Sequence, residues 1–315
     1  MRHFDARQVA AALPFSTLVP TLHDAFVRGC EVPARHPHHV GGAGTALLMP
    51  AWREGGFLGV KTVTIFPGNG SQGLPGVHAV YTLFSAQTGV PLAVMDGSEL
   101  TTRRTAAASA LAASLLARSD ATRLVVVGAG RVAGLMPAAL RSVRPGLNQV
   151  QVWNRLPDAA QRLARTLCDA GFQATATTDL QAAVQQADIV SCATLATQAL
   201  VQGDWLQPGA HLDLIGSFTP AMREADGRAL ARSRVWVDTE EALAKSGDLL
   251  QAIAEGQFDP TTVQGTLATL CRGQAPRRRR SDEITLFKSV GTALEDLAAA
   301  EQVWATADNA AHPEP

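Results

Sequence analysis

The chain has 315 residues, of which 46% are apolar and 17% are charged, and its formal net charge is −1. A chain of this length exceeds the size at which single hydrophobic cores usually divide, so two domains are expected. The near-zero charge provides no general attraction to nucleic acid or to an anionic membrane, and we expect neither as a partner.

The cysteines and the N-terminus indicate the compartment. Cys30, Cys168, Cys192 and Cys271 have no metal-ligand spacing and no pairing logic, so we expect no metal site and a reducing environment. No apolar run reaches about 18 residues, and the first residues lack the core of a signal peptide. The pattern predicts a cytoplasmic protein.

The first region, residues 1 to about 118, mixes helical and strand patterns. Helices are expected from Asp5 to Leu13 and from Leu22 to Gly29. Strands are expected at residues 46–49, 59–65, 77–84 and 91–95, the last one after a turn at residues 87–89. A long helix dense in Ala and Leu, residues 100–117, leads into the next region.

The second region alternates strands and helices from about residue 119 to 287. Its strands are marked by Val125, Val150, Ala174, Ile189, residues 211–215 and residues 235–237. This alternation predicts a parallel, doubly wound sheet. The basic run Arg277–Arg280 predicts a solvated loop. A last helix, roughly residues 289–305, is expected to pack back on the first region, and the tail 311–315 is expected to be disordered.

A glycine fingerprint lies at the first strand of this second region. The apolar run from Leu124 to Val127 leads directly into Gly128-x-Gly130-x-x-Ala133, which is followed by an Ala-rich helix. Glycines at such a turn let the backbone approach a pyrophosphate, and the helix N-terminus attracts its charge. The pattern predicts dinucleotide binding. The alternative is a tight strand–helix turn without a ligand.

The end of the next strand selects the cofactor. NAD-binding folds usually place Asp or Glu there, where it accepts hydrogen bonds from the ribose 2′-hydroxyl. This chain has Asn154 and Arg155 instead, and a guanidinium can bind a 2′-phosphate. We therefore predict NADPH, with NADH less favoured. The alternative is that Arg155 is a solvated loop cation.

Five further motifs carry a family resemblance that extends from about residue 30 to 300. The chain resembles the ornithine cyclodeaminase/mu-crystallin family in Gly59-Val-Lys61-Thr-Val-Thr, Phe66-Pro-Gly-Asn69, Thr88-Gly-x-Pro-Leu-Ala-Val-Met-Asp96-Gly, Leu100-Thr-x-x-Arg104-Thr-Ala-Ala and Ile284-Thr-Leu-Phe-Lys288-Ser-Val-Gly291-Thr-Ala-Leu-Glu-Asp296. The family contains cyclodeaminases, archaeal-type alanine dehydrogenases, ketimine reductases and a thyroid-hormone-binding crystallin. The resemblance therefore implies a fold and leaves the reaction open.

The implied fold is α/β, with two domains. A Rossmann doubly wound parallel sheet, residues 119–288, would bind NADP. An α+β substrate-binding and dimerisation domain would combine residues 1–118 with the C-terminal residues 289–315. A homodimer is the expected assembly.

Substrates of this family carry an α-carboxylate, which requires fixed cations close to the nicotinamide. The matching positions are Arg35, Lys61 and Arg104. A guanidinium at position 104 would hold a carboxylate in one orientation, although Arg103 is its neighbour on the same helix. Lys61 is at a strand centre, an unusual place for lysine unless its side chain faces a ligand. The alternatives are a solvent-facing Lys61 and a loop cation at Arg35.

The segment Gly216-Ser-Phe218-Thr219-Pro discriminates among the family's reactions. Cyclodeaminases resemble Gly-x-Asp-x-Pro here, and that aspartate handles the amine and its protons. Phe218 cannot accept a proton, so the residue argues against ornithine cyclodeamination. Asp213 lies on the preceding strand, where it can point elsewhere. The segment looks like those of the reductases of Δ1-pyrroline-2-carboxylate and Δ1-piperideine-2-carboxylate.

The remaining candidates complete the predicted site. His78 resembles a substrate-pocket position and is a candidate for assisting protonation, although a lone strand histidine is more often structural. Thr194 follows a strand end, where a nicotinamide ribose or a helix N-cap would explain it. The predicted catalytic residues are Lys61, His78 and Arg104. Substrate binding is assigned to Arg35, Lys61, Arg104, Phe218 and Thr219, and cofactor binding to Gly128, Gly130, Arg131, Val132, Asn154, Arg155, Thr194 and Gly291.

These residues favour an NADPH-dependent reductase of cyclic imino acids that forms L-proline or L-pipecolate. Such a reduction asks the protein to hold the carboxylate and to align C2 with the nicotinamide. Two alternatives stay open. One is an amino-acid dehydrogenase of the alanine dehydrogenase type, and the other is a non-catalytic binding protein of the crystallin type.

Overall fold

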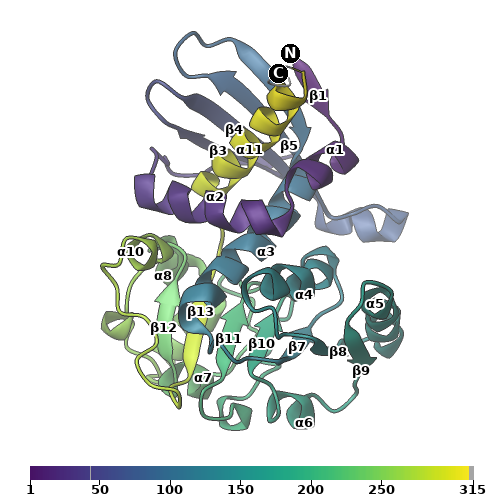
Figure 1. Ribbon diagram of the computed structural model, residues 1–315, viewed down its shortest axis with the longest axis vertical. Helices are drawn as coiled ribbons and strands as arrows, with labels where there is room; N and C mark the ends of the chain where they lie inside the picture. The colour runs from purple at the N-terminus through teal and green to yellow at the C-terminus, as the bar shows by residue number, and fades with distance from the viewer. Residues whose placement is uncertain (43, 312–315) are drawn as a thin grey trace. The chain divides into compact units, whose positions relative to one another are not determined.

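The computed structural model describes residues 1–42 and 44–311, which form two compact units (Figure 1). The first unit comprises Met1–Arg104 and Thr292–Pro315, and the second comprises Thr105–Gly291. The sequence placed the boundaries after residues 118 and 288. The first contact boundary falls inside the long helix α3 (Gly97–Leu116), so this helix contributes to both units. The predicted disordered tail lies, from residue 312 onward, outside the described residues.

The first unit is built on a six-stranded sheet in the order β1-β6-β5-β4-β3-β2. All neighbouring strands are antiparallel except β1 and β6. The predicted strands are present, each equal to or longer than expected, and β1 and β2 were not expected. The strands are β1 (Arg2–Phe4), β2 (His36–Val40), β3 (Gly44–Trp52), β4 (Phe57–Ile65), β5 (Val77–Ser85) and β6 (Pro91–Asp96).

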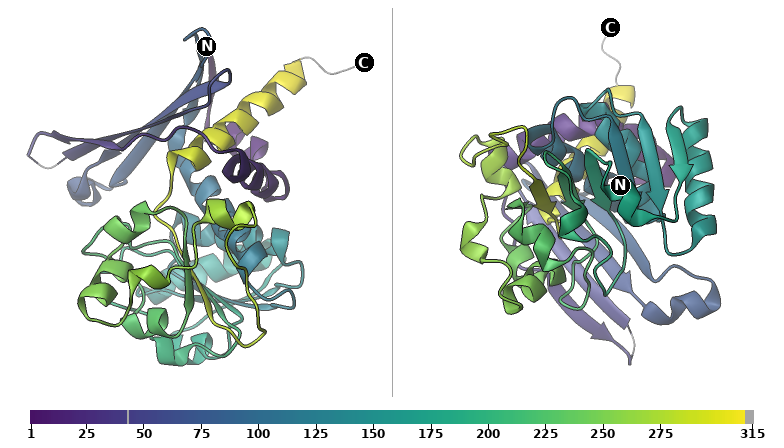
Figure 2. Two further views of the ribbon diagram at one scale, coloured as in Figure 1. Left: turned by 90° about the vertical axis from the view of Figure 1, so that its left-hand side faces the viewer. Right: turned by 90° about the horizontal axis from the view of Figure 1, so that it is seen from below.

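Three helices accompany this sheet: α1 (Ala6–Ala12), α2 (Phe15–Arg28) and α11 (Ala293–Ala311). Asp5 caps α1 by accepting a hydrogen bond from the Gln8 N–H, as its place before the helix predicts. Helix α2 begins seven residues before the predicted start, because its apolar residues from Phe15 onward recur at helical spacing toward the core. Helix α11 packs on β3, β4 and α2 (Figure 2).

The second unit contains a seven-stranded sheet in which every neighbouring pair is parallel, in the order β12-β13-β11-β10-β7-β8-β9. This confirms the doubly wound α/β prediction. Strand β13 was not expected as a strand, and it lies between β11 and β12. The strands are β7 (Arg123–Val127), β8 (Gln149–Trp153), β9 (Gln173–Ala176), β10 (Ile189–Cys192), β11 (His211–Leu214), β12 (Arg234–Val237) and β13 (Thr285–Lys288).

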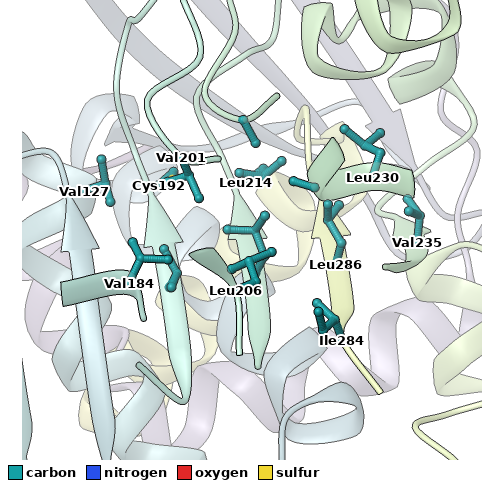
Figure 3. Close-up of a cluster of buried hydrophobic side chains, with 14 of the residues drawn as sticks. Val127, Val184, Cys192, Val201, Leu206, Leu214, Leu230, Val235, Ile284 and Leu286 are labelled. Carbon is teal, nitrogen blue, oxygen red and sulfur yellow. The ribbon is translucent and has the colours of Figure 1, made fainter. Parts of the chain in front are cut away.

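Seven helices connect these strands: α4 (Arg131–Val143), α5 (Pro157–Asp169), α6 (Leu180–Val184), α7 (Gly227–Ala231), α8 (Glu241–Lys245), α9 (Gly247–Ala254) and α10 (Leu267–Cys271). The strands carry near-continuous apolar runs, because helices cover both faces of a doubly wound sheet. One core cluster joins Val127, Cys192, Leu214 and Leu286 from four neighbouring strands (Figure 3). The strand order reverses between β7 and β10, which places a ligand crevice at the carboxyl ends of these two strands.

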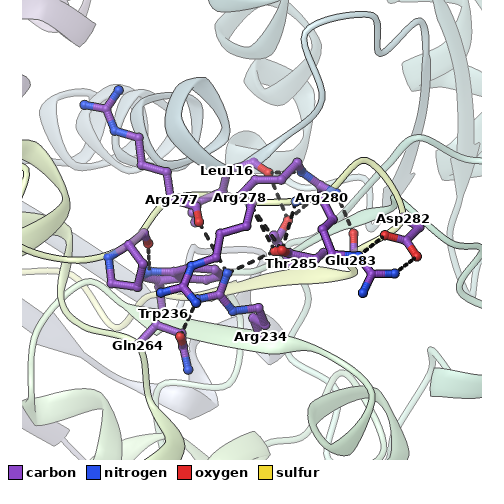
Figure 4. Close-up of polar contacts among 12 residues, drawn as sticks. Leu116, Arg234, Trp236, Gln264, Arg277, Arg278, Arg280, Asp282, Glu283 and Thr285 are labelled. Carbon is purple, nitrogen blue, oxygen red and sulfur yellow. Dashed lines mark hydrogen bonds and ion pairs between the residues drawn. The ribbon is translucent and has the colours of Figure 1, made fainter.

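The basic run is only partly the solvated loop that the sequence predicts (Figure 4). Arg277, Arg279 and Arg280 are exposed, but Arg278 is half-buried. The Arg278 guanidinium donates to the carbonyl oxygens of Leu116 and Glu283 and to the Thr285 hydroxyl. Arg278 therefore fixes the start of β13. No helix within the described residues is both long enough and apolar enough to cross a membrane.

Candidate functional site

A cavity of about 620 Å³ opens at the carboxyl ends of β7, β8 and β10 in the second unit. This is the crevice that the strand order predicts. Five predicted cofactor residues line it: Gly128, Gly130, Asn154, Arg155 and Thr194. The segment Ala193–Gln198 forms a further part of its wall.

The two glycines of the fingerprint have different physical roles. Gly128 has a φ of 117°, and a β-carbon there would lie 2.6 Å from the carbonyl oxygen of Ala193. Glycine is therefore required at this position by the chain itself. Gly130 is the N-cap of α4 with a φ of −83°, and a β-carbon there would meet no protein atom within 4 Å. The space in front of Gly130 is open, as a bound pyrophosphate at the start of α4 requires.

The cofactor-selecting pair lies at the end of β8. The Asn154 amide donates to the carbonyl oxygen of Leu156, and the Arg155 side chain is exposed at the cavity wall. The other predicted cofactor residues lie outside the cavity lining. Arg131 and Val132 form the first turn of α4. The backbone N–H of Gly291 donates to Asp238 Oδ2 after β13.

A buried carboxylate below the cavity wall was not predicted as a site residue. Glu224 Oε1 accepts hydrogen bonds from the backbone N–H and the hydroxyl of Thr194, and Oε2 accepts one from the Gly216 N–H. Its side chain is fully buried. Glu224 lies four residues after the Gly216–Pro220 segment, and a polar residue in a loop gives no sign in the sequence that it is buried.

In the first unit, four charged side chains form a buried ionic cluster from β4, α3 and α11. Lys61 Nζ lies 2.6 Å from Asp296 Oδ2. Arg104 donates from Nε to Asp296 Oδ1 at 2.8 Å and from Nη1 to Glu295 Oε2 at 2.5 Å. Lys61 is 2% exposed and Arg104 is 6% exposed. Lys61 is therefore an inward-facing lysine at a strand centre, as expected if its side chain serves a site.

Burial and neighbouring charges set the protonation of this cluster. Burial lowers the pKa of Lys61 to about 8, and the Asp296 carboxylate opposes that shift. Burial alone would raise the pKa of Asp296, but the charges of Arg104 and Lys61 hold it below its usual range. Tyr81 faces Lys61 across β5 and β4, and its buried hydroxyl has no hydrogen-bond partner among the described residues. Tyr81 is therefore a polar group at this cluster that the sequence did not single out.

The two other predicted residues of the first unit differ in their relation to this cluster. Arg35 is half-buried before β2, and its charge lowers the pKa values of both Lys61 and Asp296. His78 is exposed on β5, three residues from Tyr81. Because side chains alternate along a strand, His78 is on the opposite face of the sheet from Lys61.

The segment that discriminates among reactions follows β11 in the second unit. Phe218 is 45% exposed, and Thr219 is also exposed. Asp213 does not replace the missing aspartate, because it accepts hydrogen bonds from the hydroxyls of Ser109 and Ser191 inside the unit. Its side chain is fully buried, and burial raises its pKa to about 6.

Comparison with known proteins identifies one family and several similar proteins. The model of the ornithine cyclodeaminase/mu-crystallin family matches residues 6–311. A Δ1-pyrroline-2-carboxylate reductase of Paracoccus denitrificans is 44% identical over 261 residues, which cover 82% of this chain and 83% of that protein. The structure of the Thermococcus litoralis Δ1-pyrroline-2-carboxylate reductase in complex with NADH and L-proline is 31% identical, with a TM-score of 0.93 over 99% of this chain and 98% of that one. An archaeal alanine dehydrogenase dimer with bound NAD is 28% identical, with a TM-score of 0.91 over 99% and 97% of the two chains.

Proposed function

The chain belongs to the ornithine cyclodeaminase/mu-crystallin family, and we propose that it reduces cyclic imino acids with NADPH. The substrates would be Δ1-pyrroline-2-carboxylate, Δ1-piperideine-2-carboxylate or both, and the products L-proline and L-pipecolate. The observation that carries the proposal is the inward-facing pair of cations, Lys61 and Arg104, in a chain with Phe218 where cyclodeaminases have aspartate. Relatives named as Δ1-pyrroline-2-carboxylate reductases support it.

The residues present fit a dinucleotide, because Gly130 leaves open space at the start of α4. Gly128, Gly130 and Thr194 would hold it along the cavity wall. When bound, the reduced nicotinamide supplies a hydride to C2 of the imine, and the ring nitrogen of the substrate takes up a proton. The chain has to bind the substrate carboxylate, orient C2 and keep the imine protonated.

Lys61 and Arg104 would bind the substrate carboxylate. Arg104 contacts Asp296 and Glu295 through Nε and Nη1, so Nη2 is the group that would face a carboxylate. Lys61 is also the group best suited to supply the proton, because its pKa of about 8 keeps it protonated at neutral pH and able to release the proton. His78 is the less suitable candidate, because it is on the other face of the sheet.

The expected pH dependence follows from Lys61. If Lys61 is the donor, it is protonated below about pH 8, so kcat/KM for the cyclic imine should fall as the pH rises through that value. Asp296 raises the pKa of Lys61, so Asp296→Asn should move the inflection to lower pH. Titration of the imine itself would give the same inflection in both proteins. A pH profile that does not move in the variant would therefore remove Lys61 from the proton transfer.

The cofactor preference is proposed to come from Arg155. NADPH should be preferred over NADH by at least about tenfold, equivalent to roughly 1.4 kcal/mol, because the guanidinium binds the 2′-phosphate. Arg155→Ala should raise the KM for NADPH and leave that for NADH almost unchanged. Arg165→Ala, an exposed arginine of α5 outside the cavity lining, is the matched control. Equal kinetic efficiency with both cofactors in the unmodified protein would contradict the assignment.

We further propose a homodimer. The face of the six-stranded sheet opposite α11 carries the half-exposed Leu58 and Val60 of β4, Phe84 of β5 and Val94 of β6, together with the exposed Val80. A contiguous apolar face of this kind favours association. The archaeal alanine dehydrogenase relative is described as a dimer. Light scattering should give twice the chain mass, and a single-chain mass at micromolar concentration would contradict the proposal.

Two alternatives make different products. An alanine dehydrogenase would oxidise the reduced cofactor with pyruvate plus ammonia. A crystallin-type binding protein would bind the cofactor and turn over neither substrate. The proposed enzyme oxidises NADPH with the five- or six-membered cyclic imine, and comparing the two rings fixes the ring preference.

A further inference from the structure

Glu224 connects two strand-end segments of the second unit. Its carboxylate accepts from the Thr194 N–H at 2.7 Å and from the Thr194 hydroxyl at 2.8 Å, on the segment after β10. It also accepts from the Gly216 N–H at 2.6 Å, on the segment after β11. A buried carboxylate with three such donors holds both segments in one geometry, since losing it would leave these donors unsatisfied.

The segment after β10 forms part of the cofactor cavity, and it has no space to move toward the segment after β11. Thr194 lines the cavity. A β-carbon on Gly216 would lie 2.2 Å from the Thr194 carbonyl oxygen, and one on Gly128 would lie 3.3 Å from Thr194 Cγ2. The position of Thr194 is therefore coupled to the glycine turn on one side and to Gly216 on the other.

Glu224 is also part of a buried group of carboxyls that share one ammonium. Lys288 of β13 has no exposed surface, and its Nζ lies 3.4 Å from Asp248 Oδ2 of α9. The charge of Lys288 also acts on Glu224, on Asp213 of β11 and on Asp238 after β12, and the thiol of Cys192 on β10 completes the titratable surroundings. Each of these four carboxyl side chains is at most 1% exposed. Burial raises the pKa of Glu224 to about 7, with Lys288 opposing the shift.

The nicotinamide half of a dinucleotide would lie above this group. Asn154 and Arg155, at the end of β8, would hold the adenosine ribose, and the glycine turn after β7 would hold the pyrophosphate. The strand order continues from β7 to β10 and β11, so the other half of the dinucleotide extends over the ends of these strands. Those ends are the segments that Glu224 connects.

We propose that Glu224 is a positioning residue for the nicotinamide half of the cofactor, and that its charge makes the site prefer the oxidised, positively charged ring over the reduced, neutral ring. A fixed negative charge below the ring stabilises the positive charge that appears there when a hydride leaves, without any rearrangement of the chain. The inference rests on the proposed function only in requiring a nicotinamide cofactor.

The test is the ratio of dissociation constants for NADP⁺ and NADPH, measured by calorimetry without any imine. Glu224→Gln removes the charge and keeps the size of the side chain. The ratio Kd(NADP⁺)/Kd(NADPH) should rise about tenfold, as expected for a unit charge several ångströms away in a partly screened site. Asp188→Asn is the matched control. Asp188 is a buried carboxylate that accepts hydrogen bonds from the backbone N–H groups of Thr122 and Arg123. It directly precedes β10, at the end of the strand opposite to the Thr194 segment.

A raised ratio in Glu224→Gln and an unchanged one in Asp188→Asn would support the inference. An unchanged ratio in Glu224→Gln, or an equal change in both variants, would overturn it. If Glu224→Gln does not fold, the unmodified protein provides the same test through pH. Glu224 is ionised above about pH 7 and protonated below it, so the preference for NADP⁺ should be present at pH 8.5 and lost by pH 5.5.

The 2′-phosphate also titrates in this range, but it is present in both cofactor forms and cancels in the ratio. Asp213, whose pKa burial raises to about 6, titrates there too, so the change in the ratio should have its midpoint near pH 7 and not near pH 6 if Glu224 causes it. A ratio that is constant with pH would overturn the inference. Failure of the proposed function has a different signature. Imine turnover would then be absent while the cofactor-binding ratios still responded to Glu224.

Discussion

Substitution of Arg104 by alanine is expected to lower kcat/KM for a cyclic imino acid by about 10²-fold or more, with cofactor affinity almost unchanged. The reason is the loss of a charge-assisted pair to the substrate carboxylate next to the reacting carbon. Steady-state kinetics with the imine, together with direct titration of NADPH, would separate the two effects.

The structure adds a second consequence, because Arg104 also neutralises Glu295 and Asp296. Removing one partner of a buried ionic group costs about 3–5 kcal/mol of folding free energy, so the alanine variant should also be less stable. Arg104→Lys keeps the charge and loses the planar fork, and it should keep most of the stability while still losing activity.

Arg103→Ala is the control on the same helix. Arg103 is half-buried, pairs with Glu99 and donates to the Leu13 carbonyl oxygen, and it lies about 100° around the helix from Arg104. Its loss should change kcat/KM little. If Arg104→Lys keeps activity within a factor of about three and Arg103→Ala does not, the substrate cation is Arg103.

The second large effect is expected at Gly130. Gly130→Ala should weaken NADPH binding by at least about tenfold and lower the melting temperature little. A β-carbon at this position meets no protein atom within 4 Å, so any loss of affinity has to arise from a clash between the new methyl group and the bound cofactor. Calorimetric titration and a thermal melt of the same sample would give both numbers.

Two neighbouring glycines provide the comparison. Gly134→Ala, inside α4, brings its β-carbon no closer than 3.5 Å to Leu163. This substitution should lower neither the NADPH affinity nor the melting temperature. Gly128→Ala should lower both stability and affinity, because the chain itself requires the positive φ. A Gly130→Ala protein that binds NADPH as well as the original would mean that the fingerprint is a tight turn without a ligand.

The parallel sheet could be predicted because each of its central strands is a local apolar run followed by a glycine or a turn. Strand β13 could not be predicted in the same way. It follows all the other described strands in sequence but lies between β11 and β12 in the sheet. It therefore becomes a strand only by pairing with two segments that are distant in sequence. Strand β2 has five exposed residues, including Pro37, and shows no apolar alternation.

The candidate site was predictable where a residue contradicted its local pattern. Lys61 in the centre of an apolar strand indicated an inward-facing charge, and the structure buries it. The carboxylate partners of Lys61 and Arg104 could not be derived from the sequence. Asp296, which contacts both, lies 192 residues from Arg104 in the chain and reaches it only through the packing of α11. Glu224 was missed for the same reason, since its three donors lie on two other segments.

The choice between cyclic-imine reduction and ornithine deamination can be measured directly. The purified protein should be given Δ1-pyrroline-2-carboxylate with NADPH and, separately, L-ornithine with NAD⁺, and proline and ammonia should be measured in both reactions. Phe218 cannot handle the protons of deamination, so we expect proline from the imine and neither proline nor ammonia from ornithine. Ammonia release from ornithine at a rate comparable to imine reduction would contradict it.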